Sequence, residues 1–356
     1  MRNSAPALAL LLGLSLLARA SADQADHRLD IYWNDVEGGG GTLIVTPAGE
    51  SILIDAGNPG TRDPGRIRRT AAQAGLTRID YFILTHFHVD HFGGAAQLAT
   101  LLPIGQVYDR GVPDRDPDHQ NDAIWIRMSA AYRVFPAAGR HRVTAGLVLP
   151  LRQVGDLPLA LRCVASGGEF IPAPPGAPAN PRAGENSHHD LPSTDNDLSS
   201  SWVLSFGPFR FYDGGDLTWN MEGALVTPVN RVGQVDVYQV DHHGLELSNN
   251  PVLVHSLAPT VSVMNNGIRK GTMPSTMAAL RSSPGLQAMY QLHKNLRPGD
   301  PQDNTADEYI ANHGSNPNHE DANIIRLSVD PTGKSYTISI PATGFQRTYA
   351  TRLDKP

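Results

Sequence analysis

Four potential metal ligands lie within six residues of one another, directly after a short apolar run. The run Tyr81–Thr85 is long enough for one buried strand, and it is followed by His86, His88, Asp90 and His91. Imidazole nitrogens suit zinc, iron or manganese, and a carboxylate adds a hard oxygen donor. The alternative is a polar loop that is histidine-rich by chance. So dense a cluster of donors after a strand favours a metal site.

This stretch, THFHVDHFGG, resembles the His-x-His-x-Asp-His signature of the metallo-β-lactamase superfamily. In that family the first two histidines bind one metal ion, and the Asp-His pair binds a second. The resemblance therefore implies that His86 and His88 hold the first site, and that Asp90 and His91 hold the second. It also implies two divalent ions as cofactors, which we expect to be zinc, with manganese as the alternative.

Two later stretches are similar to those of the ComEC-type hydrolase domain and the bacterial phosphorylcholine esterases. Such relatives carry an Asn-Asp-x-Ser-like stretch, then Gly-Asp, then His-His-Gly. The matching pieces here are residues 196–199, 215–216 and 242–244, and the resemblance covers about residues 29–265. It implies that Asp216 bridges the two ions and that one of His242 and His243 completes the second site, of which we favour His243. Asp213 is the competitor for the bridging role, but it precedes the glycine turn.

One feature of the family is missing. Many members have a separate third histidine for the first site, between the motif and the bridging aspartate. The histidines in that interval have no family-like context; they are His119, His141, His188 and His189. We therefore expect Asn196 or Asp197 to lie near the first site and to contact the substrate. We expect His242 to contact the substrate or to orient a ligand.

The resemblance implies a hydrolase that uses a metal-bound hydroxide, with Asp90 and His242 as its catalytic residues. Two ions about 3.5–4 Å apart can share that hydroxide and lower the pKa of the water from which it forms. The resemblance of residues 196–199, 215–216 and 242–244 to the ComEC-type domain favours a phosphodiester or phosphate ester as the substrate. A lactam, lactone or thioester hydrolase is the alternative, because attack at a carbonyl uses the same nucleophile. A further alternative is that the protein is not an enzyme but a protein that binds metal without catalysis.

The amino terminus has the features of a secretory signal peptide over residues 1–22. Arg2 precedes the apolar run Ala5–Ala18, and Ala20-Ser21-Ala22 forms a small-residue cleavage site. The run is short for a bilayer span, so we expect a periplasmic or secreted protein without membrane insertion after processing. Removal of Arg2 and Arg19 lowers the Lys and Arg count from 29 to 27 against 35 Asp and Glu, a net charge of −8. This acidity gives no signature of nucleic-acid binding.

Strand-like runs occur on both sides of the motif, and helix-like segments lie between them. The expected strands cover residues 29–33, 42–46, 51–55, 79–85, 157–165, 199–205, 209–212, 235–240, 257–264, 323–329 and 336–340. Hairpin turns exclude a purely parallel sheet, so we expect an αββα sandwich of two mixed sheets flanked by helices. The sequence predicts one such domain over residues 23–356, with insertions near 109–150, 167–195 and 265–320.

Three aromatic residues in the first insertion have two interpretations. Trp125, Tyr132 and Phe135 belong to or follow an expected amphipathic helix at residues 123–134. They either line a substrate cleft or pack this helix against the core. The single cysteine, Cys163, is expected to be a buried strand residue.

Overall fold

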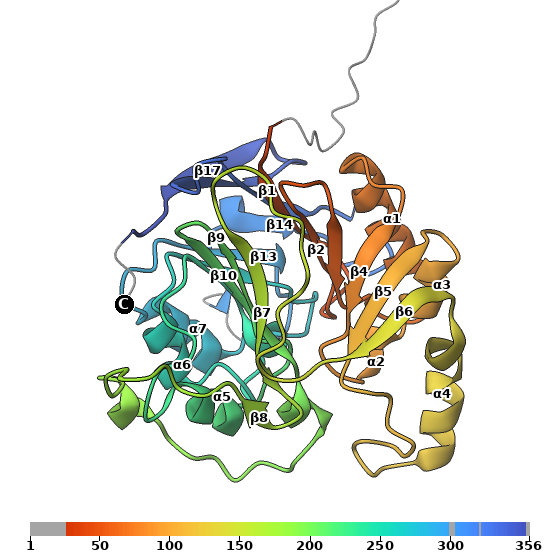
Figure 1. Ribbon diagram of the computed structural model, residues 1–356, viewed down its shortest axis with the longest axis horizontal. Coiled ribbons are helices and arrows are strands. Elements are labelled where there is room, and N and C mark those ends of the chain that lie inside the picture. Colours follow the sequence, from red (N-terminus) through yellow and green to blue (C-terminus); the bar gives the residue numbers. More distant parts are fainter. Residues whose placement is uncertain (1–25, 299–302, 320–321, 354–356) are drawn as a thin grey trace, which may run out of the picture.

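The computed structural model describes residues 26–298, 303–319 and 322–353, which form two mixed β-sheets with helices on their outer faces (Figure 1). The expected signal peptide at residues 1–22 lies outside the described residues. Within the described ranges, no helix is both long enough and apolar enough to cross a membrane.

The first sheet has the strand order β17-β16-β15-β1-β2-β3-β4-β5-β6. Strands β3 to β6 are parallel, and the other neighbours are antiparallel. The bounds are β1 (Leu29–Trp33), β2 (Thr42–Val45), β3 (Ser51–Ile54), β4 (Ile79–Ile83), β5 (Ile104–Asp109), β6 (Ala137–Arg142), β15 (Ile325–Val329), β16 (Ser335–Ile340) and β17 (Phe345–Ala350).

The second sheet has the order β14-β13-β12-β11-β10-β9-β7-β8, with β10 to β14 parallel. The bounds are β7 (Leu159–Ser166), β8 (Glu169–Phe170), β9 (Ser201–Phe206), β10 (Phe209–Asp213), β11 (Val237–Gln239), β12 (Val261–Met264), β13 (Ala288–His293) and β14 (Ile310–Asn312). The buried Cys163 lies on β7, as expected.

Three apolar clusters hold the layers together. One lies between the sheets and includes Trp33 and Trp202, both fully buried. A second packs the first sheet under its helices, and a third does the same for the second sheet. The helices over the first sheet are α1 (Arg62–Gln73), α2 (Val89–Phe92), α3 (Ala95–Ala99) and α4 (Asp122–Val134); those over the second are α5 (Trp219–Val226), α6 (Pro251–Leu257) and α7 (Pro274–Arg281) (Figure 1). The αββα sandwich is therefore confirmed.

The regions expected to be insertions contribute to both sheets. Strand β6 extends the first sheet, and β13 and β14 extend the second. The sequence does not predict β6, which reads AAGRHR without apolar alternation, or β14, which is only three residues long. The expected strand at residues 257–264 was too long, since Leu257 ends α6 and β12 begins at Val261.

The aromatic residues of α4 pack against the first sheet. Trp125 and Tyr132 contact Phe87 and Phe92, and Phe135 lies 6.4 Å from Phe82 between ring centroids. The packing interpretation of these residues is therefore correct, and the cleft-lining one is wrong. These contacts fix the loop that follows β4, on which the metal motif lies.

Candidate metal centre

The predicted ligands lie just past the carboxyl ends of three strands. His86, His88, Asp90 and His91 follow β4, Asp216 follows β10, and His242 and His243 follow β11. The backbone of His242 and His243 has φ angles of 52° and 59°, in the left-handed region. Such a conformation costs of order 1 kcal/mol or more for a non-glycine residue, and it is typical of functional sites. Here it accompanies two adjacent imidazoles that both approach Asp216.

One carboxylate oxygen, Asp216 Oδ2, is the centre of the site. It lies 3.3 Å from His91 Nε2, 3.3 Å from His243 Nε2, 3.5 Å from His242 Nε2 and 3.8 Å from His86 Nε2. Asp90 Oδ2 lies 3.6 Å from His243 Nε2 and 3.8 Å from His91 Nε2. The structure therefore brings residues from three separate segments to one position. Asp213, the competitor, accepts a hydrogen bond from Gly215 N instead.

The donor set fits divalent metal ions. Two groups of closely spaced donors are present, namely His86, His91 and Asp216, and Asp90, His91 and His243. The Nε2 atom of His86 is buried and has no hydrogen-bond partner among the described residues. The Nε2 atoms of His91 and His243 lie 3.2 Å apart, too close for both to carry a proton. Protons cannot occupy both of these nitrogens at once. Metal cations placed among these atoms could be bound by all of the nitrogens.

Electrostatics within the site keep His86 and Asp90 in the forms that bind metal, but favour the protonated form of His91. Burial, reinforced by the neighbouring His91, lowers the pKa of His86 well below its usual value and keeps it neutral. Burial would raise the pKa of Asp90, but the charges of His91 and Lys270 lower it and keep this carboxylate ionised. Burial lowers the pKa of His91, but Asp216 and Asp55 raise it by more. Binding of a metal at His91 therefore requires release of a proton.

A carboxylate behind the motif orients His91. Asp55 Oδ2 lies 2.7 Å from His91 Nδ1, which leaves Nε2 facing Asp216. Asp55 also accepts hydrogen bonds from the backbone N–H and the hydroxyl of Thr85. A partner of this kind fixes both the tautomer and the ring orientation of a metal-binding histidine.

His88 has a similar partner that the sequence analysis did not identify. Its Nε2 lies 2.7 Å from Asp118 Oδ2, and its ring lies beside that of His86, with 4.6 Å between centroids. His88 belongs to neither group of closely spaced donors, but this bond leaves its Nδ1 for a metal. Asp118 also accepts a hydrogen bond from the backbone N–H of Asp195, which ties two loops to the motif. Only the abundance of Asp in residues 109–121 hinted at this role.

Replacing Asp118 with asparagine is expected to weaken metal binding about 10-fold, at the low end of the range for such partners because Asp118 is only half-buried. The asparagine amide would donate to His88 Nε2 and so favour a proton on Nδ1, where a metal ligand cannot carry one. Metal affinity measured by competition with a chelator tests this. Asp114→Asn, an exposed change in the same loop, is the control. Equal affinity in the two variants would contradict the role.

The two residues expected near the substrate have different positions. Asn196 Nδ2 lies 3.3 Å from His242 Nε2, and Ser248 Oγ lies 3.1 Å from His242 Nδ1. Asp197 instead closes the capping box of the short helix η2 (Asp195–Leu198) and accepts a hydrogen bond from Thr218. Asn196 is therefore at the site, while the contacts of Asp197 are structural. The sequence could not separate these two neighbours.

The histidines considered as a third ligand of the first site all lie elsewhere. His119 and His188 are exposed. His141 lies 2.7 Å from Gln106 Oε1, and His189 stacks on Trp219. His242 does approach the same carboxylate oxygen as His86: their Nε2 atoms lie 3.5 Å and 3.8 Å from Asp216 Oδ2.

Lys270 is a further charged group that the sequence analysis missed. Its Nζ lies 2.5 Å from Asp90 Oδ2, although the two residues are 180 positions apart in the sequence. The Lys270 side chain is about one-third exposed, so it lies between the donors and the solvent. The site thus presents one cation at its rim, in a chain whose formal net charge is −6.

Comparison with known proteins agrees with the motif. Residues 38–149 match a family model described as the metallo-beta-lactamase superfamily. A metal-dependent hydrolase of Cupriavidus metallidurans is 35% identical over 83 residues, which are 22% of this chain and 26% of that protein. The chain therefore matches about a quarter of the length of that relative. The matched family segment contains Asp55 and the four ligands of the motif, but it ends before Asp216.

Solved structures include several that are similar to this chain. A metallo-β-lactamase of Cronobacter sakazakii is 18% identical, with a TM-score of 0.35, and the match covers 56% of this chain and 69% of that one. A diphosphatase of the PhnP family is 13% identical, with a TM-score of 0.39, and the match covers 73% of this chain and 94% of that one.

Proposed function

We propose that this member of the metallo-β-lactamase superfamily is a metal-dependent hydrolase that acts on phosphodiesters or phosphate esters. The observation that carries the proposal is the approach of four imidazole Nε2 atoms to one oxygen of Asp216, within 3.3–3.8 Å. Purely structural histidines do not require this concentration of ligands around one buried carboxylate.

The residues divide into binding and substrate-handling groups. His86 and His88 would hold one ion, Asp90, His91 and His243 would hold a second, and Asp216 would contact both. Bound ions would supply a nucleophilic water at neutral pH and would polarise the substrate. Asp90 positions the attacking water. His242 remains on the substrate side, where Ser248 and Asn196 fix its ring.

Lys270 favours a substrate with an anionic group, which a phosphodiester always carries and a simple lactone lacks. It lies at the rim of the centre, where its ammonium can contact a phosphate oxygen. A cavity of about 250 Å³ nearby is lined in part by Arg110 and Arg142. Arg110 pairs with Asp195, which accepts a hydrogen bond from Phe87 N, between the two histidines of the first site. Arg110 and Lys270 therefore lie beside the motif, each paired with an aspartate.

A panel of substrates tests the proposed class. Bis-nitrophenyl phosphate should be hydrolysed by the metal-loaded protein, and removal of metal by a chelator should abolish this hydrolysis. Turnover of a cephalosporin or a lactone alone would replace the phosphoester proposal with that alternative. A fully metal-loaded protein that hydrolyses none of the three would support metal binding without catalysis.

Lys270→Gln is expected to raise KM for the phosphodiester about 10-fold or more, because a hydrogen bond to a charged group contributes about 1.5–3 kcal/mol. The value of kcat and the bound metal should change little. The matched control is Lys294→Gln, which removes another lysine that pairs with an aspartate, Asp307. If Lys270→Gln instead lowers bound metal, the lysine supports Asp90 rather than the substrate.

We also propose that the protein is exported, on the basis of the signal-peptide features of residues 1–22. Amino-terminal sequencing of protein recovered from the periplasm or the medium should give a chain that begins at Asp23. Recovery of the full-length chain from the cytoplasm alone would contradict export.

A further inference from the structure

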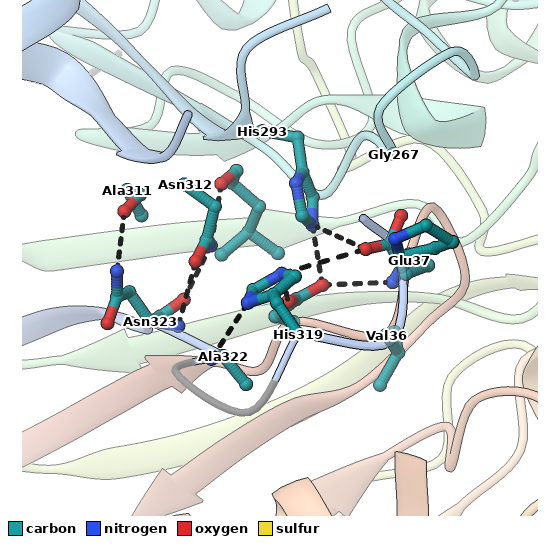
Figure 2. Close-up of polar contacts among 12 residues, drawn as sticks. Val36, Glu37, Gly267, His293, Ala311, Asn312, His319, Ala322 and Asn323 are labelled. Atoms are coloured by element: carbon teal, nitrogen blue, oxygen red, sulfur yellow. Dashed lines mark hydrogen bonds and ion pairs between the residues drawn. The ribbon is translucent and has the colours of Figure 1, made fainter. Parts of the chain in front are cut away.

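A second group of histidines and carboxylates lies outside the candidate metal centre and shares no residue with it. Its members are Asp35, Glu37, His293 and His319. Asp35 and Glu37 follow β1, His293 ends β13, and His319 lies between β14 and β15. Figure 2 shows Glu37, His293 and His319 pointing toward one another from three separate segments. Each member offers one donor atom, and these four atoms all lie within 4.8 Å of one another.

The distances between the donor atoms approach the donor–donor distances around a four-coordinate metal ion. Zinc bound at about 2.0–2.1 Å to nitrogen or oxygen separates neighbouring donors by about 3.3–3.4 Å in a tetrahedron. Glu37 Oε1 lies 3.4 Å from His293 Nε2 and 3.8 Å from His319 Nε2. His319 Nε2 lies 3.1 Å from Asp35 Oδ2. The shortest contact is a hydrogen bond of 2.6 Å between His293 Nε2 and Asp35 Oδ1. Metal binding would replace this hydrogen bond after the two atoms moved slightly apart.

Glu37 is the member that points most clearly to a ligand. Its side chain is only 8% exposed, and its Oε1 has no hydrogen-bond partner among the described residues. Burial raises the pKa of this carboxyl, and the neighbouring imidazole of His293 only partly offsets the effect. The residue also has a φ of 55°, which favours glycine, in a turn that already contains four glycines. A glutamate at this position is costly unless its carboxylate is used.

We propose that Asp35, Glu37, His293 and His319 bind one divalent transition-metal ion of the zinc class. Two imidazoles and two carboxylates form a complete set for a closed four-coordinate site. Arg66 lies 2.9 Å from Asp35 Oδ2 and offsets one of the two carboxylate charges. The remaining charge of −1, with neutral imidazoles, leaves the site attractive to a divalent cation. A protonated imidazole would balance the same charge, so a metal-free ion-pair network is the rival.

The bound ion would connect three segments behind the candidate metal centre. Arg66 donates hydrogen bonds to the backbone carbonyls of Pro317 and His319, so the last of these segments already lies against α1. Glu37 begins the glycine turn, and Gly40 N donates to Asp90 O in the motif. The ion would therefore stabilise the turn on which the motif loop rests, without contact with the substrate.

Bound zinc measured by mass spectrometry tests this site. The protein, without an affinity tag, is equilibrated with zinc and dialysed. Glu37→Gln, which nearly preserves shape, should carry one equivalent less than the wild type. Glu185→Gln is the matched control, because Glu185 also contacts a histidine, His255, and belongs to neither group of donors. It should carry as much zinc as the wild type. The test uses this difference, so it does not depend on how many ions the candidate centre holds.

Further variants assign the missing ion to its site. His319→Gln, at a partly exposed position, should lose the same single equivalent as Glu37→Gln and serves if the latter does not fold. Asp216→Asn, which removes the central carboxylate of the candidate centre, should retain the equivalent. Circular dichroism confirms that each variant is folded. If folded Glu37→Gln or His319→Gln carries as much zinc as the wild type, the cluster is a metal-free ion-pair network and the proposal fails.

Discussion

Replacing Asp216 with asparagine is expected to lower hydrolysis about 10³-fold, which corresponds to the several kcal/mol that metal-assisted charge stabilisation supplies. The physical reason is the position of Asp216 Oδ2, 3.3 Å from both His91 Nε2 and His243 Nε2. Asparagine fills nearly the same volume but removes the negative charge at the centre of the donor set. Bound metal, measured by mass spectrometry, should fall in parallel with the rate on bis-nitrophenyl phosphate.

Asp213→Asn is the matched control for this prediction. Asp213 is buried at the same strand end, but its Oδ1 accepts a hydrogen bond from Gly215 N at 3.0 Å, which an asparagine oxygen can also accept. Burial raises the pKa of Asp213 to about 7, so this carboxyl is already about half protonated near neutral pH and the substitution removes about half a charge. Metal content and rate should stay within about 2-fold of the wild type, since isosteric changes of this kind cost little. An inactive Asp213→Asn with an active Asp216→Asn would reverse the assignment.

The parts of the centre that follow single strands could be predicted from the sequence. The four donors of the motif lie within six residues, so their spacing alone identifies it; they are His86, His88, Asp90 and His91. The positions of the later donors follow from a similar rule, because the carboxyl ends of neighbouring strands meet at one edge of a sheet. The structure places Asp216, His242 and His243 at such ends, near the motif.

Contacts between loops could not be predicted in this way. Asp118 meets His88, and Lys270 meets Asp90, across 30 and 180 positions of sequence. Neither pairing has a local pattern, since each depends on how separate loops fold over the strand ends. The same reason applies to Asp35 and His293, which are 258 positions apart and lie at the ends of strands from different sheets. Such pairs become visible only when both sheets are placed.

The glycine turn before β2 is a different case, because its composition indicates a turn but does not reveal what the turn packs against. Gly40 lies directly against the pair formed by Asp55 and His91. A Cβ at this position would lie 2.5 Å from Asp55 Oδ2 and 2.7 Å from His91 Nδ1, well inside van der Waals contact. Glycine is therefore needed at position 40 because the backbone packs closely against Asp55 and His91. This need is separate from the backbone conformation of the turn.

Gly40→Ala is accordingly expected to weaken metal binding about 100-fold, the upper end of the effect of disturbing a ligand's supporting partner. The added methyl group must displace Asp55, His91 or the turn, and all three are buried. Overpacking of this kind should also lower the free energy of unfolding by about 1–3 kcal/mol. Metal affinity by chelator competition and thermal unfolding of the metal-free protein measure the two effects separately.

Gly65→Ala provides the matched control because it makes the same chemical change within α1, where a Cβ meets no atom within 4 Å. Alanine is favoured over glycine in a helix by about 0.5–1 kcal/mol, so this variant should unfold at a slightly higher temperature and bind metal normally. If Gly40→Ala binds metal as tightly as Gly65→Ala does, the glycine turn can yield without moving His91. The contact between Asp55 and His91 would then not be what holds this ligand in place.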